Sequence, residues 1–498
     1  MTCGIFSYFR FIFNFFNMFQ YSKKSKQNSR ERDIERNVIF EENEEEQTVE
    51  KKISYKRASL MIAFYGYLYF VSFLDQFMYL AILPIIKEEY QAAEVTHPLL
   101  ILAFLCLQVI LSPFLTCYTS YYNHKMVMCV GLFFYSFLSF GCTFIPQQGF
   151  WLFILARLFV AAMAESCLAT VPLVIADLFH PEKRTRVLGL YTCSKAFCCM
   201  FACIFGTTIL NLASQHWRYA LWTTPVLGLF GLVLAIIIMK EPEGMDEEED
   251  VNLKLDSSCF SDLKKLLTNC TYLAFTAGVL CYAFVYGANF LWVSKLLNET
   301  RTELDIKTHC LTTDCHYDDN VFYGVINCAM NLIGLIIGME LSKRYKKSHP
   351  YTDPVLCGIG LMICAPILTL FIVFQGINFI VAYVFIAIAG VFQAICLVPI
   401  LNMKLDLVDP KLHKTANVME LFLTKLIGSI GPSVFIIKVS EALMKIIPNG
   451  TKLTSMQFAM TIIPVMALIG AVFFFITVYR LKKKKKKAEM LSAIIIQK

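Results

Sequence analysis

Catalytic signatures are missing from this sequence. Its apolar segments contain no phosphate-binding glycine loop, no hydrolase nucleophile elbow and no metal-ligand spacing. We therefore expect no enzyme, no resident metal and no cofactor. The first 20 residues, although rich in phenylalanine, also lack the small-residue cleavage site of a secretory signal. For them we predict an interfacial anchor, in preference to a thirteenth span.

Long apolar runs dominate what is present. Hydrophobic residues make up 57% of the 498 residues, and the mean hydropathy is +0.58. This composition excludes a soluble globular protein. Runs long enough to cross a bilayer as helices lie at 58–84, 98–120, 126–146, 151–179, 187–210, 220–239, 270–293, 321–340, 354–375, 377–402, 415–437 and 456–479. The sequence therefore predicts an all-α membrane protein with twelve transmembrane helices.

Basic residues mark alternate connections between these runs. They follow the fourth, eighth and tenth runs and end in a lysine tail: Lys183, Arg184, Arg186, Lys343, Arg344, Lys346, Lys347, Lys404, Lys411, Lys414 and 482–487. Because cytosolic loops of membrane proteins are enriched in lysine and arginine, both termini are predicted to be cytosolic. We expect the lysine tail to contact anionic lipid headgroups and not nucleic acid.

Glycosylation and disulfide signals concern the opposite side of the membrane. Asn298 and Asn449 begin Asn-X-Thr sequons in connections that the charge pattern places outside the cytosol, whereas the sequon at Asn269 should face the cytosol and stay bare. Cys310 and Cys315 share one non-cytosolic connection, which predicts a local disulfide. Histidines flank the two cysteines, so a metal site remains an alternative there.

Two charged segments divide the chain. Residues 1–57 have mixed charge after the phenylalanine-rich start, which predicts a mostly disordered cytosolic arm. Residues 240–267 include the stretch EPEGMDEEED and separate the first six runs from the last six, which is typical of a cytosolic linker. We therefore predict six-helix bundles at 58–239 and 268–480, followed by a basic cytosolic tail at 481–498.

The two predicted bundles carry related stretches. Asp177-Leu-Phe-His-Pro181 follows the fourth run and Asp406-Leu-Val-Asp-Pro410 follows the tenth, each with a threonine shortly afterwards. Ten residues beyond those threonines lie Lys195 and Lys425, about 15 Å into the next helix. Equivalent lysines fit two pseudo-symmetric bundles related by an axis along the membrane normal, with coincidence as the alternative for so short a match.

Six ionisable residues lie inside the apolar runs: Asp75, Arg157, Glu165, Lys195, Glu420 and Lys425. A charge at mid-membrane costs about 2.5–3.5 kcal/mol on insertion scales, so it usually faces a partner or a wet cavity. The six groups either neutralise one another as structural ion pairs or line a transport site. None of the eight histidines lies inside a run, so a proton relay would depend on the three acids. We expect the six to converge on one solvent-reachable site.

Several short motifs carry a family resemblance. They are Glu340-Leu-Ser-Lys-Arg344, Asp353-Pro-Val-Leu-Cys357, Ala365-Pro366, Leu74-Asp75, Trp217-Arg-Tyr-Ala-Leu221 and Thr224-Pro225. With them the chain resembles the Spinster type of the major facilitator superfamily, the family of lysophospholipid and sphingosine-1-phosphate transporters. The resemblance covers about residues 58–440 and implies two six-helix halves that rock to give alternating access.

Departures from the family pattern concern the turn between spans two and three and the charges within the membrane. The aspartate common in that turn is Ser120 here. An ungapped alignment puts Ala164 at the family glutamate, and Glu165 follows one residue later, turned about 100° around the helix. The family histidine of span eleven is Lys425. Proton coupling therefore stays open, whereas the added cation favours an anionic headgroup.

Together these features predict a monomeric secondary transporter of an amphiphilic lipid, either a lysophospholipid or a sphingolipid such as sphingosine-1-phosphate. The resemblance favours the late endosome or lysosome over the plasma membrane. Headgroup contacts are expected from Arg157, Lys195 and Lys425. Proton or switch roles are expected from Asp75, Glu165 and Glu420. The alternatives are a non-transporting membrane regulator of the same fold and a carrier of a small organic anion or sugar.

Overall fold

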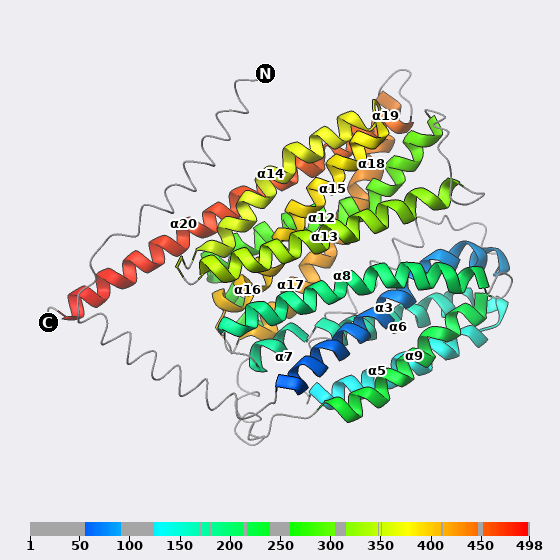
Figure 1. Ribbon diagram of the computed structural model, residues 1–498, viewed down its shortest axis with the longest axis horizontal. Helices are drawn as coiled ribbons and strands as arrows, with labels where there is room; N and C mark the ends of the chain where they lie inside the picture. Colours follow the sequence, from blue (N-terminus) through cyan, green and yellow to red (C-terminus); the bar gives the residue numbers. More distant parts are fainter. Residues whose placement is uncertain are drawn as a thin grey trace. The chain divides into compact units, whose positions relative to one another are not determined.

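The described part of the protein is built from long α-helices. The structure is a computed structural model, and it describes residues 55–90, 124–169, 171–178, 181–212, 217–239, 259–303, 315–346, 348–349, 351–409, 412–446 and 452–496. These residues contain no β-strand. Figure 1 shows the helices lying roughly alongside one another, as expected for a chain that crosses a membrane repeatedly.

Among the described residues, five long helices and one short helix precede the predicted linker. They are α3 (Tyr55–Glu89), α5 (His124–Gly141), α6 (Phe150–Ala169), α7 (Val171–Leu178), α8 (Pro181–Leu212) and α9 (Trp217–Ile238). Two short 3₁₀ turns, Cys142–Phe144 and Gln147–Gly149, make the tight connection between α5 and α6. We refer to α3 and α5–α9 together as the first half.

The helices after the predicted linker form the second half. They are α11 (Cys259–Thr268), α12 (Cys270–Glu303), α13 (Cys315–Lys346), α14 (Thr352–Phe374), α15 (Phe379–Ile395), α16 (Leu397–Leu407), α17 (His413–Lys425), α18 (Gly431–Ile446), α19 (Lys452–Met460) and α20 (Ile462–Ile496). A π-helical turn, η5 (Leu426–Ile430), joins α17 to α18.

Nine helical stretches in the described residues are long and apolar enough to cross a membrane. They are Lys125–Phe144, Gln147–Glu165, Trp217–Ile238, Cys270–Arg301, Tyr323–Lys346, Thr352–Phe374, Phe379–Leu407, Thr415–Ile446 and Leu453–Lys486. Each coincides with a predicted span. Helices α3 and α8 occupy the predicted first and fifth spans, while the second span (98–120) lies outside the described residues, so the total of twelve stays a prediction.

Asparagine side chains start two of the second-half helices. Asn269 Oδ1 accepts hydrogen bonds from the backbone N–H of Thr271 and Tyr272, at 3.1 and 3.3 Å. Asn378 Oδ1 does the same for Ile380 and Val381. These N-caps satisfy donors that have no partner within the helix. The sequon at Asn269 therefore coincides with a helix cap.

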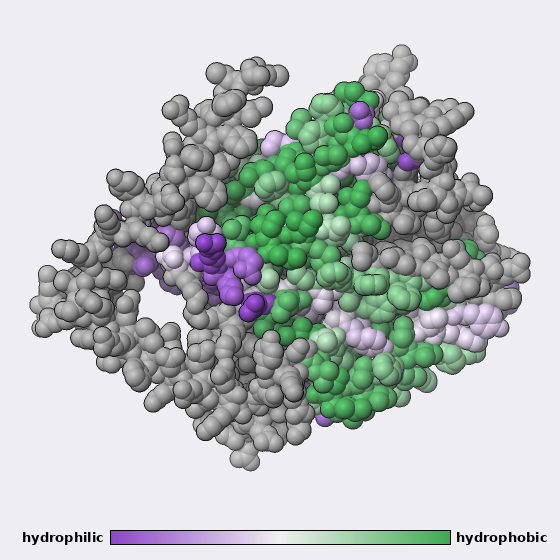
Figure 2. All heavy atoms as spheres, viewed as in Figure 1, coloured by the Kyte–Doolittle hydropathy of each residue, from purple (hydrophilic) through white to green (hydrophobic). Residues whose placement is uncertain are grey.

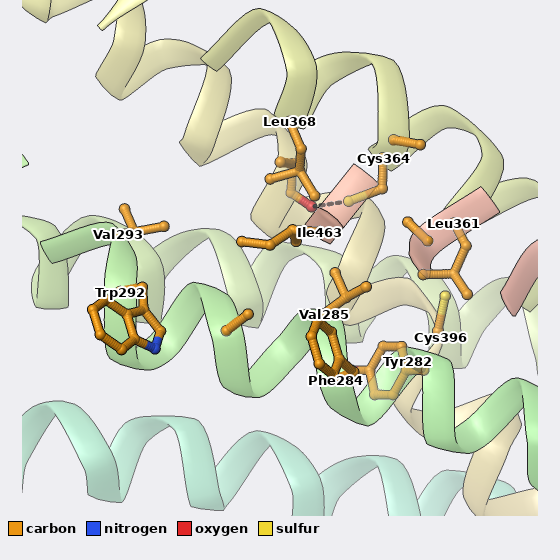
Figure 3. Close-up of a cluster of buried hydrophobic side chains, with 14 of the residues drawn as sticks. Tyr282, Phe284, Val285, Trp292, Val293, Leu361, Cys364, Leu368, Cys396 and Ile463 are labelled. Carbon is orange, nitrogen blue, oxygen red and sulfur yellow. Dashed lines mark hydrogen bonds between the residues drawn. The ribbon is translucent and has the colours of Figure 1, made fainter. Parts of the chain in front are cut away.

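Each half has its own hydrophobic core. The core of the second half is the larger one and includes Tyr282, Val285, Leu361, Cys364 and Phe474. Figure 3 shows Tyr282 and Val285 on α12 close to Leu361 and Cys364 of α14, and Cys364 donates a hydrogen bond to a backbone carbonyl of α15. A separate cluster in the first half joins α3 to α6 and α9.

The two halves pack against each other chiefly through α8 and α13. Helix α8 lies beside α13 in Figure 1, and their residues make extensive contacts. The crossing is close at Gly189, where an added Cβ would lie 2.3 Å from Met339 Sδ. Figure 2 shows hydrophobic residues over broad areas of the helices and hydrophilic residues gathered near the end of α13. The broad apolar areas fit contact with lipid chains.

Candidate functional site

The charged residues inside the helices fall into separate contacts, not into the single cluster that we expected from the sequence. Asp75 pairs with Arg157, Glu165 with Lys425, and Glu420 with Lys404. Lys195 contacts two tyrosine rings. One of these contacts joins the two halves, and the others lie within one half.

The first ion pair lies inside the first half. Arg157 Nη2 of α6 is 3.2 Å from Asp75 Oδ1 of α3, and the two residues are 2% and 4% exposed. Ser139 accepts a hydrogen bond from Arg157 at 3.1 Å, and Thr224 donates one to Asp75 at 2.6 Å. The Tyr79 ring lies 5.1 Å from the guanidinium carbon. Four helices thus satisfy both charges, because Ser139 comes from α5 and Thr224 from α9.

The second ion pair connects the halves. Lys425 Nζ donates to Glu165 Oε1, bringing the end of α17 to α6. Their side chains are 24% and 17% exposed, so this pair is less buried than the first one. Glu165 is eight residues beyond Arg157, or about 80° around α6 after two full turns. One helix therefore presents Arg157 to its own half and Glu165 to the other.

A π-helical turn begins immediately after Lys425. Helix α12 approaches this turn so closely that a Cβ on Gly287 would lie 1.6 Å from the carbonyl oxygen of Gly428. Pro432, which has no N–H to donate, follows at the start of α18. π-helical turns are rare and frequently found at functional sites. Here one sets the position of Lys425 against α12.

The third ion pair lies inside the second half. Lys404 Nζ is 3.3 Å from Glu420 Oε2 and donates to Asn417 Oδ1 at 2.5 Å. Lys404 and Glu420 are each 8% exposed. The sequence puts Lys404 in the connection after the tenth run, whereas the structure extends α16 through it to Leu407. Glu420 is therefore paired inside its own half.

Lys195 is held by aromatic rings within the first half. Its Nζ lies 5.1 Å from the centroid of the Tyr69 ring on α3 and 4.6 Å from that of Tyr191 on α8. The face of an aromatic ring attracts a cation. The side chain is half-buried, so the lysine is partly accessible.

A polar network closes the end of the molecule at which α8 begins and α16 ends. Asp406 at the end of α16 accepts from Arg184 of α8 and from Lys346 of α13, the latter at 2.6 Å. Lys346 also lies 3.3 Å from Asp353 at the start of α14. Arg184 thereby ties the first half to three helices of the second.

Uncharged side chains complete this network. Asp353 accepts from Ser342 at 2.5 Å, Ser342 accepts from Asn402 at 3.2 Å, and Asn402 accepts from Thr185 at 3.3 Å. Thr185 follows Arg184 in the chain, so the hydrogen bonds form a closed ring. Two of the motifs quoted for the resemblance, 340–344 and 353–357, supply Ser342 and Asp353 to it.

The motif at 217–221 has a structural role at the other end of the first half. Arg218 Nη2 is 2.8 Å from Glu89 Oε1, and Trp217 Nε1 donates to the second carboxylate oxygen. Arg218 Nε also donates to the carbonyl of Thr143, at 3.1 Å. These contacts join the end of α3 to the start of α9 and to the turn after α5.

The predicted modification sites lie mostly outside what the structure describes. Cys310 and Asn449 fall outside the described residues, as does the side chain of Cys315, which begins α13. Asn298 lies within α12 and not in a loop, and Thr300 of its sequon is buried, with its hydroxyl bonded to the carbonyl of Leu296 at 2.8 Å. The disulfide and both glycosylation sites stay predictions.

Buried amides are the functional candidates that sequence reasoning missed. Asn289, Asn331, Gln393 and Asn402 lie inside helices and are at most 7% exposed. Uncharged polar residues are common enough in membrane helices that nothing in their spacing distinguished them from structural residues. Only their pairing in space, as for Asn289 with Gln393, indicates a shared site.

Comparison with known proteins identifies the family. A family model described as Major Facilitator Superfamily matches residues 66–432. Protein spinster homolog 1 of Xenopus laevis is 31% identical over 443 residues, which are 88% of this chain and 84% of that protein. The chain belongs to the Spinster family of the major facilitator superfamily. The predicted family and fold class are thereby confirmed, as is a multi-pass membrane protein.

Solved structures share the fold of this chain. A bacterial homolog of the human lysosomal transporter Spinster, crystallised inward-facing and unoccupied, has a TM-score of 0.62 at 17% identity, covering 86% of this chain and 99% of that one. The fucose:proton symporter of Escherichia coli has a TM-score of 0.60 at 15% identity, covering 84% and 99%. Because the identities are low, these two similarities concern the fold.

The structure shows where Ala164 and Glu165, the two positions concerned in the expected one-residue shift of the family glutamate, lie. Ala164, which the resemblance aligns with the family glutamate, packs against the cluster of Val71, Tyr135 and Val160 inside the first half. Glu165 follows it and reaches Lys425, which the resemblance aligns with the family histidine. The two departures expected from the resemblance thus involve the two partners of one ion pair between the halves.

Proposed function

We propose that this protein is a secondary transporter of an amphiphilic lipid with an anionic or zwitterionic headgroup, working by alternating access. The observation that carries the proposal is the ion pair between Glu165 and Lys425. It is a partly exposed pair of opposite charges between helices of different halves. An anionic headgroup that binds Lys425 must displace Glu165, and this displacement loosens a contact between the halves.

If the headgroup displaces Glu165 from Lys425, the substrate binds the two conformations of the protein with different affinities, as a conformational change requires. A ligand shifts an equilibrium only as far as its affinities for the two states differ. In the empty state Lys425 is neutralised by Glu165; in the loaded state the headgroup phosphate neutralises it. Glu165 then lacks its cation in a partly desolvated place, and binding of a proton there would restore neutrality. In this proposal Glu165 is the switch acid and the site of proton coupling.

The other intramembrane charges have different parts in the proposal. Lys195, half-buried beside Tyr69 and Tyr191, is a second headgroup contact. Arg157 is committed to Asp75, Ser139 and Tyr79, so headgroup binding by Arg157 would require that buried pair to open. We therefore assign Asp75 and Arg157 to holding the first half together, and Glu420 to the same task in the second.

The polar network around Asp406 is the proposed cytosolic gate. We place this end in the cytosol because the basic connections cluster here, which also puts both termini in the cytosol. Contacts of Asp406 with Arg184 and Lys346 would hold that gate closed. The bundles 58–239 and 268–480 are the proposed rocking bodies. We further propose a monomer in the late endosomal or lysosomal membrane.

A flux assay tests the proposal. Purified protein in liposomes should move lysophosphatidylcholine across the bilayer, with the rate compared at equal pH and with a pH gradient. Lys425→Gln should lower the flux at least tenfold. Lys438→Gln is the matched control, because this exposed lysine lies on α18 of the same segment. Unchanged flux in Lys425→Gln would remove the proposed headgroup role.

A non-transporting regulator is the second candidate. The observation that favours it is the altered turn between spans two and three, where Ser120 replaces the family aspartate and Thr116 and Thr119 replace glycines. Saturable binding of lysophosphatidylcholine without net flux in the same liposomes would select this candidate. Competition of the flux by fucose or a soluble organic anion would instead indicate a carrier of small polar substrates.

A further inference from the structure

Two buried amides face each other between α12 and α15. Asn289 Nδ2 donates to Gln393 Oε1 at 3.1 Å, and the residues are 6% and 4% exposed. Asn289 Oδ1 and Gln393 Nε2 are left without a partner. Whichever way the two amides are turned, one hydrogen bond between them leaves one acceptor and one donor open. Buried polar atoms almost always have a partner, so this pair lacks a ligand or a water.

The surroundings of the amide pair are polar but uncharged. Tyr323 of α13 donates its hydroxyl hydrogen to the backbone carbonyl of Asn289 at 3.0 Å. Asn327 Oδ1 of α13 lies 3.6 Å from where a Cβ on Gly390 would be, one turn before Gln393 on α15. These amides contact no charged side chain among the described residues. A site with one open acceptor and one open donor fits a hydroxyl group, which both donates and accepts.

The amide pair lies near the proposed headgroup site. Gly287, two residues before Asn289, meets Gly428, three residues after Lys425. Helices α12 and α17 run in the same direction, because three intervening passes separate them. The five-residue offset corresponds to about 7.5 Å along the helix axes. This offset is a separation along the helix axes, and the flexible Lys425 side chain together with the few bonds between the phosphate and the glycerol hydroxyl of a lysophospholipid can span it.

We infer that Asn289 and Gln393 bind a hydroxyl group of the lipid substrate next to its headgroup. This inference rests on the proposed function, since it places the hydroxyl of the same molecule whose headgroup binds Lys425. The amide pair selects lipids with a free hydroxyl near the phosphate. An analogue without that hydroxyl cannot pair these two buried polar atoms, so it should bind more weakly.

The test compares two lipids on the full-length protein. The probes are 1-oleoyl-lysophosphatidylcholine and its 2-deoxy analogue, which differ in one hydroxyl. Binding to the purified protein and flux in liposomes are both measured. Wild type should bind the hydroxylated lipid at least about tenfold more tightly. Asn289→Leu with Gln393→Leu should bring the ratio of the two affinities close to one.

A matched control and two separable outcomes make the test decisive. Gln375→Leu should keep the wild-type ratio, because Gln375 is a fully buried amide of the same half that accepts from Thr300, 11 residues beyond Asn289 on α12. Equal affinities of wild type for the two lipids overturn the inference, and this measurement needs no variant. Discrimination in binding with no flux of either lipid supports the amide site and overturns the proposed transport.

Discussion

The two ion pairs made by α6 differ in what surrounds them. Arg157 and Asp75 have side-chain exposures of 1% and 5%; Arg157 also donates a hydrogen bond to Ser139, and Asp75 accepts one from Thr224. Lys425 and Glu165 are 24% and 17% exposed, and Glu165 Oε2 is buried without a hydrogen-bond partner. A fully satisfied dry pair resists change, whereas a partly solvated and incompletely satisfied pair can exchange partners. The first therefore suits structure and the second suits switching.

The largest expected effect comes from breaking the dry pair. Arg157→Leu leaves the Asp75 carboxylate buried without its cation, which should destabilise the protein by about 3–5 kcal/mol. The measurement is the melting temperature in detergent together with the folded yield. Asp75→Leu combined with Arg157→Leu is the control, and it should recover much of the loss because no charge is left unpaired. A stable Arg157→Leu protein would contradict the structural role.

Breaking the pair between the halves should affect function more than stability. A partly exposed ion pair contributes less to stability than a fully buried one, so Lys425→Gln should shift the melting temperature less than Arg157→Leu while reducing lysolipid flux at least tenfold. Both quantities are measured on the same preparation. If Lys425→Gln strongly destabilised the protein while its folded fraction kept the flux, the Glu165–Lys425 pair would be structural, like the Asp75–Arg157 pair.

The ion pairs of Asp406 in the proposed cytosolic gate can be compared with the Glu165–Lys425 pair. Both sets join the two halves, but those of Asp406 lie at one end of the molecule. Asp406→Ala removes a carboxylate shared by Arg184 and Lys346, of which Lys346 keeps Asp353, and this should favour separation of α8 from α13 by about 1 kcal/mol. Cys193, which packs against Leu335 and Met339 at that interface, should then react several-fold faster with maleimide, as followed by mass spectrometry. Asp409→Ala, at another exposed aspartate nearby, should leave the rate unchanged.

The smallest expected effect concerns Lys195. Its contacts with Tyr69 and Tyr191 are of a kind worth about 0.5–1 kcal/mol where partly exposed. Lys195→Gln should therefore lower lysolipid flux only a few-fold and leave the melting temperature nearly unchanged. A loss of flux as large as that of Lys425→Gln would give the two lysines equal parts in headgroup binding.

Much of the fold could be predicted from the sequence, because a bilayer imposes one length and one polarity on every helix that crosses it. The nine described stretches of membrane-spanning length coincide with predicted spans, whereas α11 lies in the predicted linker. The candidate site residues were also conspicuous, since charges inside apolar runs are rare. The tenth run was predicted to end at residue 402, but α16 continues through Lys404, whose charge is paired with Glu420.

The sequence could not predict which side chains pair with one another. The one-residue shift from Ala164 to Glu165 predicts a rotation, but only the packed helices bring Glu165 to Lys425. The separation of the charges into dry and wet pairs likewise depends on Ser139, Thr224 and Asn417, which belong to other helices. Uncharged residues such as Asn289 and Gln393 became visible only through their contact.

The affinity of the Glu165→Gln protein for 1-oleoyl-lysophosphatidylcholine tests the central claim most directly. If the headgroup competes with Glu165 for Lys425, removing the carboxylate charge should tighten lipid binding about tenfold relative to wild type. Lys425→Gln should weaken it, and the double variant should behave like Lys425→Gln. Unchanged or weaker binding to Glu165→Gln would contradict the account, because Glu165 would then not be the group that the substrate displaces.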